Sequence, residues 1–223
     1  AKTFDIFIQL GAILAIVWLF RRRLARSLVA AGHEPASRRF VGNLIIAFLP
    51  AAVVGFLAHD WIKARLFNPT VVAVALIVGG ILIVLIERWA PPGPIDDVNA
   101  VPPRTALGIG LAQVLSLIPG TSRSGATILG GYALGLTRVA ATEFSFFLAI
   151  PVMLAATVYD LVKSWPALTP GDGPLFAVGF IVSFLAAVVT VRAFLSYVSH
   201  HSFRLFAWYR IAFGALLLLS RSA

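Results

Sequence analysis

The sequence predicts an all-α polytopic membrane protein, a class indicated by its composition, its long apolar runs and the position of its basic residues. Of its 223 residues, 60% are hydrophobic and only 12% are charged, and the mean hydropathy is +0.94. This apolar share exceeds that of an ordinary soluble domain. We therefore expect one integral membrane domain over residues 1–223. Cysteine is absent, so helix packing in the lipid bilayer, not disulfides, must hold it together.

The basic residues define an orientation. The formal net charge is +9, but the arginines gather at the ends of apolar runs, so we expect a membrane partner and no nucleic acid. Residues 21–39 carry six arginines against the single acid Glu34. Because cytoplasmic loops carry the excess of Lys and Arg, this loop is predicted to be cytoplasmic and residue 1 to lie outside.

About six transmembrane helices are predicted from apolar runs long enough to span about 30 Å of hydrocarbon. They cover residues 4–20, 40–58, 70–87, 139–163, 175–197 and 206–220. Residues 59–69 and 165–174 are expected to form external loops. Residues 88–104 hold five prolines and should form an extended cytoplasmic connection. Its acidic pair Asp96-Asp97 suggests a solvated turn, with a metal site as the alternative.

A shorter apolar stretch departs from this pattern. Residues 105–118 would reach only about 21 Å as a helix, and Pro119-Gly120 then interrupts it. A second short piece, residues 126–136, follows a polar run. Two half-length helices around a polar break predict a re-entrant hairpin over about residues 105–136. If this stretch crossed the membrane instead, the arginines near residues 192–204 would lie outside, against the charge bias.

The polar run PGTSRSGAT, residues 119–127, concentrates hydrogen-bond donors at the expected hairpin tip. Its glycines let backbone amides turn toward a ligand, and the following helix presents its N-terminus, where free amides and the helix dipole favour anions. A guanidinium offers a fork of donors that suits phosphate oxygens. The run therefore predicts an anion site. The residues that would form it are Gly120, Thr121, Ser122, Arg123, Ser124, Gly125 and Thr127.

The same residues could instead have a purely structural role. The hydroxyls could join helices, and Arg123 could pair with an acid such as Glu143. Glu143 could equally pair with Arg138 or Arg210, or it could take part in the site. Arg210 could likewise either form a structural ion pair or take part in the site. Gln113 faces either the site or a neighbouring helix. An arginine retained deep in a bilayer is costly, which favours the site reading for Arg123.

The chain resembles a known family, the bacterial undecaprenyl-diphosphate phosphatases, also called bacitracin-resistance proteins. The resemblance covers the whole chain. It rests on PGTSRSGAT and on four supporting stretches, which are FDIFIQLGAILA (4–15), LFNP (66–69), ATEFSFFLAIP (141–151) and FAWYR (206–210).

The resemblance implies an enzyme that hydrolyses undecaprenyl diphosphate to undecaprenyl phosphate and inorganic phosphate, recycling the lipid carrier for peptidoglycan synthesis and conferring bacitracin resistance. It implies an inverted-repeat fold with two re-entrant hairpins in the bacterial inner membrane, and an active site facing the periplasm.

The family's first motif, an acidic pair with a serine-rich turn and a histidine, belongs upstream of FDIFIQLG and is not present in this sequence. We therefore expect an N-terminal segment with the second hairpin to be missing. The divalent cation that the family implies, Mg²⁺ or Ca²⁺, would have its ligands outside this chain.

Roles follow as hypotheses. Arg123, Ser122 and Thr127 are assigned to catalysis, with Gly120, Thr121, Ser124 and Gly125 binding the diphosphate. Glu143, Arg210 and Gln113 form a second tier.

Three rival functions are weighed. A transporter or flippase for a lipid phosphate or small anion would use a similar broken-helix site. Acid-phosphatase-like lipid phosphatases need a histidine six residues after the arginine, where this chain has Leu129. A purely structural membrane subunit is the third. The sequence leaves homo-oligomer formation open.

Overall fold

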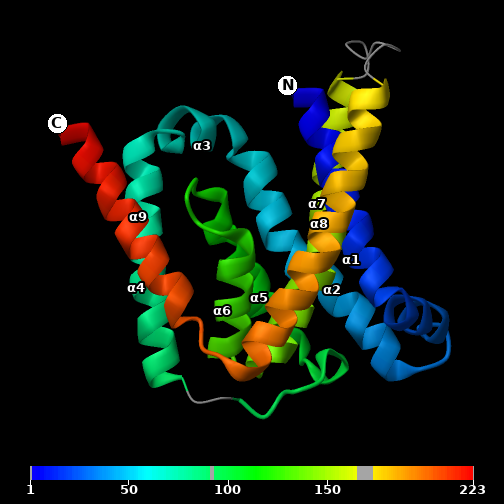
Figure 1. The fold of residues 1–223 in the computed structure, drawn as a ribbon. Helices are drawn as coiled ribbons and strands as arrows, with labels where there is room; N and C mark the ends of the chain where they lie inside the picture. The colour runs from blue at the N-terminus through cyan, green and yellow to red at the C-terminus, as the bar shows by residue number, and fades with distance from the viewer. Residues whose placement is uncertain (1, 91–92, 165–172, 223) are drawn as a thin grey trace.

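The computed structural model describes residues 2–90, 93–164 and 173–222, which fold into helices joined by short connections without any strand (Figure 1). The α-helices are α1 Lys2–Ala30, α2 Pro35–Leu57, α3 His59–Leu66, α4 Pro69–Trp89, α5 Pro103–Val114, α6 Arg123–Ala133, α7 Arg138–Ser164, α8 Gly173–His200 and α9 Arg204–Ser222. Two short 3-10 helices, η1 Val98–Ala100 and η2 Leu115–Leu117, lie before and after α5. The predicted all-α class is confirmed for this part of the chain.

Five of the described helices are long and apolar enough to cross a membrane. These candidate spans are Phe4–Ala30, Pro35–Leu57, Pro69–Trp89, Arg138–Tyr159 and Gly173–His200. The sixth predicted crossing, residues 206–220, falls within α9 and is not among them. Arg204 and Arg210 within α9 lower the hydropathy of that helix.

The loop predicted over residues 21–39 is mostly helical, which corrects the expected end of the first helix. α1 continues past Phe20 and through the arginines to Ala30, and α2 already begins at Pro35. Arg, Leu and Ala are strong helix formers, so the helix continues beyond the end of the apolar run, where the sequence predicts its end. Pro35 lies at the first position of α2, where its missing amide hydrogen costs nothing.

The predicted loop at residues 59–69 contains the short helix α3. Asp60 in its first turn and Lys63 and Arg65 in its last turn complement the helix dipole, a local signal that the apolar pattern did not capture. Asn68 then caps α4, because its side chain accepts a hydrogen bond from the amide of Val71 at 3.0 Å. Of the second predicted external loop, 165–174, residues 165–172 lie outside the described residues.

The stretch predicted as a hairpin forms two antiparallel helices, α5 and α6, in the middle of the molecule (Figure 1). The α4–α9 pair lies on one side, while α5 packs on α2 and α6 packs on α7. α5 approaches α2 closely, since a Cβ on Gly110 would lie 2.6 Å from the carbonyl oxygen of Ala47. Both ends of the hairpin lie at the end of the molecule opposite α3, and its loop points toward α3.

Backbone hydrogen bonds fasten the base of the hairpin to the connection before α5. The amide of Ile95 donates to the carbonyl of Gly135 at 3.1 Å, and the amide of Thr137 donates to the carbonyl of Ile95 at 2.8 Å. Gly135 has a φ of +96°, a conformation that residues with a Cβ rarely adopt. The chain therefore turns sharply here between α6 and α7.

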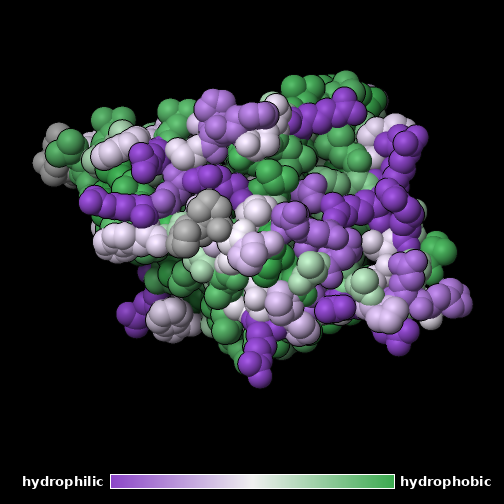
Figure 2. Space-filling model, turned by 90° about the horizontal axis from the view of Figure 1, so that it is seen from below, coloured by the Kyte–Doolittle hydropathy of each residue, from purple (hydrophilic) through white to green (hydrophobic). Residues whose placement is uncertain are grey.

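Hydrophilic side chains gather at the end of the molecule that carries the base of the hairpin (Figure 2). The connections 31–34, 93–102 and 201–203 lie at this end. Exposed arginines border these connections. They are Arg22, Arg26, Arg38, Arg39, Arg88, Arg104 and Arg204.

Candidate functional site

The hairpin tip is pressed against α4 at Gly120. This residue has a φ of +91°, and a Cβ on it would lie 2.6 Å from the carbonyl oxygen and 2.8 Å from the Cα of Val72. Both the turn and the close approach therefore require glycine. Pro119-Gly120 ends the first half of the hairpin and fixes its tip on the backbone of α4.

Ser122 caps the helix that follows. Its Oγ accepts a hydrogen bond from the amide of Gly125 at 3.1 Å and lies 3.1 Å from Oγ of Ser124. An N-cap of this kind satisfies one of the four amides that a helix start leaves free. The amides of Arg123 and Ser124 come before the first intrahelical bond and stay available to an anion.

Thr127 lies inside the fold and does not face open space. Its side chain is buried, and Oγ1 contacts the carbonyl oxygens of Arg123 and Ser124 at 3.0 and 3.2 Å. Oγ1 also lies 2.7 Å from Oγ of the buried Ser145 on α7. Thr127 therefore braces the first turn of α6 against α7.

Arg123 points to the α7 side of the hairpin. Its Nη1 donates to the carbonyl oxygen of Ser145 at 3.2 Å, and its Nη2 lies 3.6 Å from Sδ of Met153. A thioether is a weak acceptor. The guanidinium is thus held in place by neutral groups, and much of its donor capacity is not taken by a strong acceptor.

Arg210 reaches the hairpin from α9. Its Nη2 donates to the carbonyl oxygens of Gly120, at 3.0 Å, and Ala75, at 3.2 Å. Its Nε is buried and has no hydrogen-bond partner among the described residues. The structure therefore brings a second arginine to the hairpin tip.

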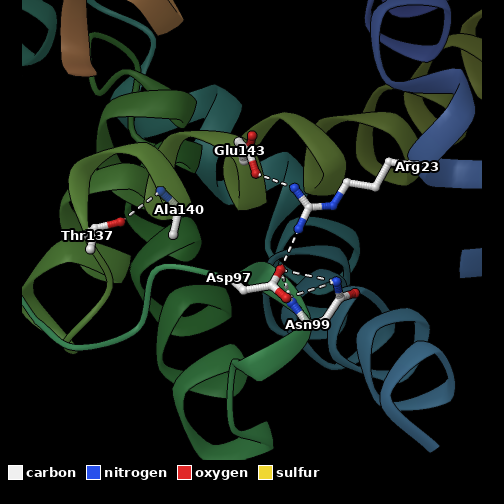
Figure 3. Close-up of polar contacts among 6 residues, drawn as sticks. All are labelled: Arg23, Asp97, Asn99, Thr137, Ala140 and Glu143. Atoms are coloured by element: carbon white, nitrogen blue, oxygen red, sulfur yellow. Dashed lines mark hydrogen bonds and ion pairs between the residues drawn. The ribbon is translucent and has the colours of Figure 1, made fainter. Parts of the chain in front are cut away.

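Neither arginine at the tip is in an ion pair with a carboxylate of the described chain, and Glu143, Asp97 and Glu87 pair with other arginines. Glu143 pairs with Arg23 at 2.7 Å, so the predicted partners Arg123, Arg138 and Arg210 are not the ones it uses (Figure 3). Arg23 also pairs with Asp97, which accepts hydrogen bonds from Asn99 as well. The solvated turn expected at Asp97 thus holds an ion pair.

Glu87 is a further acid that pairs with an arginine. Its side chain is 1% exposed and accepts a hydrogen bond from Nε of Arg138 at 3.0 Å. The amide of Phe203 donates to the same oxygen at 2.9 Å. Arg138, one of the predicted partners of Glu143, is therefore bound to Glu87.

A cavity of about 440 Å³ lies beside α6. Thr121, Ser122, Ser124, Gly125 and Arg210 contribute its polar lining. Its other walls are mostly apolar and come from α4, α6, α8 and the start of α9. They include Leu82, Ile86, Leu129, Phe194, Phe206 and Tyr209. A cavity with anion-binding groups among apolar walls suits an amphiphile with an anionic headgroup.

This donor set fits an anion and does not fit a divalent cation. The cavity lining contains hydroxyls and an arginine but no carboxylate. Within residues 2–90, 93–164 and 173–222, no group of three or more His, Cys, Asp or Glu side chains could hold a metal ion. Mg²⁺ and Ca²⁺ take oxygen ligands, mainly carboxylates.

The structure divides the predicted site residues into two groups. Thr121, Ser122, Ser124, Gly125 and Arg210 line the cavity, and Gly120 lies directly against Arg210. The others do not line it. These are Arg123 and Thr127, which face α7, Glu143, which pairs with Arg23, and Gln113, which is buried with both amide atoms unpartnered.

Sequence reasoning did not single out Ser145, nor the aromatic walls of the cavity from α8 and α9. Ser145 lies in the stretch ATEFSFFLAIP, which points to the family but gives no local sign of a contact with Thr127. Phe194 and Phe206 have the pattern of ordinary apolar helix residues. Only their position beside α6 distinguishes them.

Comparisons with known proteins match the chain over nearly its full length. Residues 1–216 match the family described as bacitracin resistance protein BacA. An undecaprenyl-diphosphatase of Aromatoleum aromaticum is 56% identical over 218 residues, which are 98% of this chain and 80% of the relative. One from Methylococcus capsulatus is 53% identical over 217 residues, 97% of this chain and 80% of the relative. Undecaprenyl-diphosphatase 2 of Rhodospirillum rubrum is 56% identical over 216 residues, which are 96% of this chain and 78% of the relative.

Proposed function

The chain belongs to the bacitracin resistance protein BacA family, and from this membership we propose that it hydrolyses undecaprenyl diphosphate to undecaprenyl phosphate and inorganic phosphate. The activity returns the lipid carrier to peptidoglycan synthesis and confers bacitracin resistance. Water attacks the terminal phosphorus and the bond from that phosphorus to the bridging oxygen breaks. Undecaprenyl phosphate departs with the bridging oxygen as the leaving group, and the terminal phosphoryl group, joined to the oxygen of the water, becomes inorganic phosphate.

One observation carries the proposal for the site. Arg123 and Arg210 meet the hairpin tip without a carboxylate partner among the described residues, while Glu87, Asp97 and Glu143 are paired elsewhere. An arginine inside a membrane protein is costly unless a charge or a ligand compensates it. A diphosphate supplies that charge, and its prenyl tail fits the apolar walls of the adjoining cavity.

The residue roles follow from these contacts. Arg210 would bind phosphate oxygens in the cavity, and Arg123, on the α7 side of the same tip, would help to stabilise the charge that spreads over them in phosphoryl transfer. Ser122, Ser124 and Thr121 would donate further hydrogen bonds from the cavity wall, together with the first amides of α6. Thr127 would hold the first turn of α6 in position through Ser145.

The membrane topology is part of the same proposal. α9 would be the sixth crossing, since its 19 residues reach about 28 Å as a helix. The hairpin would enter from the cytoplasm, because its two ends share the arginine-rich end of the molecule. Its tip points to the opposite end, which favours an active site open to the periplasmic side of the inner membrane.

The divalent cation, Mg²⁺ or Ca²⁺, would take its ligands from outside this chain. The general base would likewise come from outside the cavity lining, which contains neither a carboxylate nor a histidine.

The decisive experiment measures phosphate release from undecaprenyl diphosphate by the detergent-purified full-length protein, without a membrane potential. We expect turnover in the wild type and none in Arg123→Ala, which should insert and purify normally. Arg88→Ala is the matched control, because Arg88 is an exposed arginine at the end of α4 outside the cavity. Movement of the lipid across a vesicle membrane without phosphate release would instead identify a transporter.

A further inference from the structure

One face of α4 meets both the hairpin tip and Arg210. Val72, Ala75 and Gly79 follow one another at helical spacing, three and four residues apart, so they lie along one stripe. Gly120 packs on Val72, and Nη2 of Arg210 donates to the carbonyl oxygen of Ala75. The guanidinium of Arg210 therefore lies against α4, between α9 and the hairpin tip.

Gly79 provides the space for this crossing. A Cβ on Gly79 would overlap Nη2 of Arg210 and would lie 3.1 Å from its Cζ and 3.2 Å from its Nε. The three nearest atoms to that Cβ all belong to the guanidinium, and none belongs to another helix backbone. A methyl group here would therefore displace the charged group itself.

The neighbouring glycine, Gly80, packs against α9. A Cβ on Gly80 would lie 2.6 Å from Cγ1 of Ile211 and 2.7 Å from the carbonyl oxygen of Ala207. Gly80 is buried and lets α4 and α9 approach closely, and the three atoms nearest to its Cβ would belong to Ile211 and Ala207. The pair Gly79-Gly80 thus contains one residue that accommodates the guanidinium and one that packs two helices.

We propose that Gly79 is a positioning residue for Arg210. Its bare surface lets Nη2 bridge the carbonyl oxygens of Ala75 and Gly120, which ties the cation to the hairpin tip. Arg210 and Gly79 both line the cavity. This inference rests on the proposed function, because it assumes that Arg210 binds the phosphate of the substrate.

The test is a double-mutant cycle on phosphate release by the full-length protein, with kcat and KM measured separately. We expect Gly79→Ala to lower kcat/KM about 100-fold, the cost of misplacing a catalytic group by about an ångström. Adding Gly79→Ala to Arg210→Ala should cause no further loss, because the guanidinium it would displace is gone. Gly42→Ala is the control, because a Cβ on this glycine of α2 would have no atom within 4 Å, and its turnover should stay within about 3-fold of wild type.

Each outcome decides the proposal. Wild-type turnover in Gly79→Ala overturns the proposal. An equal loss of kcat/KM when Gly79→Ala is added to the wild type and to Arg210→Ala also overturns it, because a glycine with a purely structural role would matter even without Arg210. If Gly79→Ala does not accumulate, recovery of folding in Gly79→Ala/Arg210→Ala supports the proposal and misfolding of both rejects it. Wild-type turnover in Arg210→Ala would reject the role of Arg210 in the proposed function together with this inference.

Discussion

Arg210 on α9 donates a hydrogen bond of 3.0 Å from Nη2 to the carbonyl oxygen of Gly120 at the tip of the α5–α6 hairpin. The two residues are 90 positions apart in the chain. This contact joins the last helix to the polar run and places a cation, with a free buried Nε, at the wall of the cavity.

Arg210→Lys should lose about 100-fold or more in turnover, comparable to removing a donor that stabilises the transition state. A lysine keeps the charge but lacks the planar fork of donors. It cannot donate to the carbonyl oxygens of Ala75 and Gly120 and at the same time bind two phosphate oxygens. Phosphate-release kinetics would measure the loss, with circular dichroism to confirm the fold. Near-normal turnover would show that charge alone suffices at this position.

Thr127→Val should lower stability by about 1 to 3 kcal/mol, because it leaves the buried hydroxyl of Ser145 without its partner. Turnover should fall with it as the first turn of α6 loosens. Thr127→Ser retains the hydroxyl and should stay close to wild type in both melting temperature and turnover. Equal damage from the two substitutions would contradict a role for the hydroxyl.

Glu143→Gln should leave turnover unchanged and cost at most about 1 kcal/mol, since its partner Arg23 is 31% exposed and solvent screens the pair. Thermal unfolding and phosphate release measured on the same preparation would separate the two effects. Asp96→Asn is the control, as Asp96 is exposed and makes no ion pair in the part of the chain described. A loss of turnover in folded Glu143→Gln would place this carboxylate in the site after all.

Glu87→Gln should be the most damaging of these changes to folding, at about 3 kcal/mol. Its carboxylate is 1% exposed, against 21% for that of Glu143, so water cannot take its place as the partner of Arg138 and of the amide of Phe203. Arg204→Ala is the matched comparison. That arginine is 62% exposed and 3.9 Å from Glu87, so its loss should be nearly neutral. Yield and melting temperature would report both, and equal effects would argue against Glu87 as the main contact.

Much of the fold could be predicted from the sequence, and five of the residues assigned to the candidate site line one cavity. Apolar runs predicted the helices, and the short stretch before Pro119 predicted the hairpin, because a break in hydrophobicity is a local property. Helix ends were less predictable. α1 passes through its arginines to Ala30, since helix propensity continues where hydrophobicity ends.

The ion pairs could not be predicted, because they join distant residues. Glu143 had three plausible arginine partners by position in the sequence, yet Arg23, 120 residues away, is the one it binds. Helix packing decides which side chains meet, and no spacing rule within one helix encodes it. The same holds for Ser145 against Thr127 and for Glu87 against Arg138.

The sequence by itself determined that this is a helical membrane protein and that residues 119–127 form a turn rich in donors, because composition and local pattern suffice for both. Only the tertiary structure decided which donors share a space. It turns Arg123 and Thr127 toward α7, and it brings Arg210 across Gly79 to the tip. The direction of each side chain depends on which helix packs beside it, and that packing is a property of the whole fold.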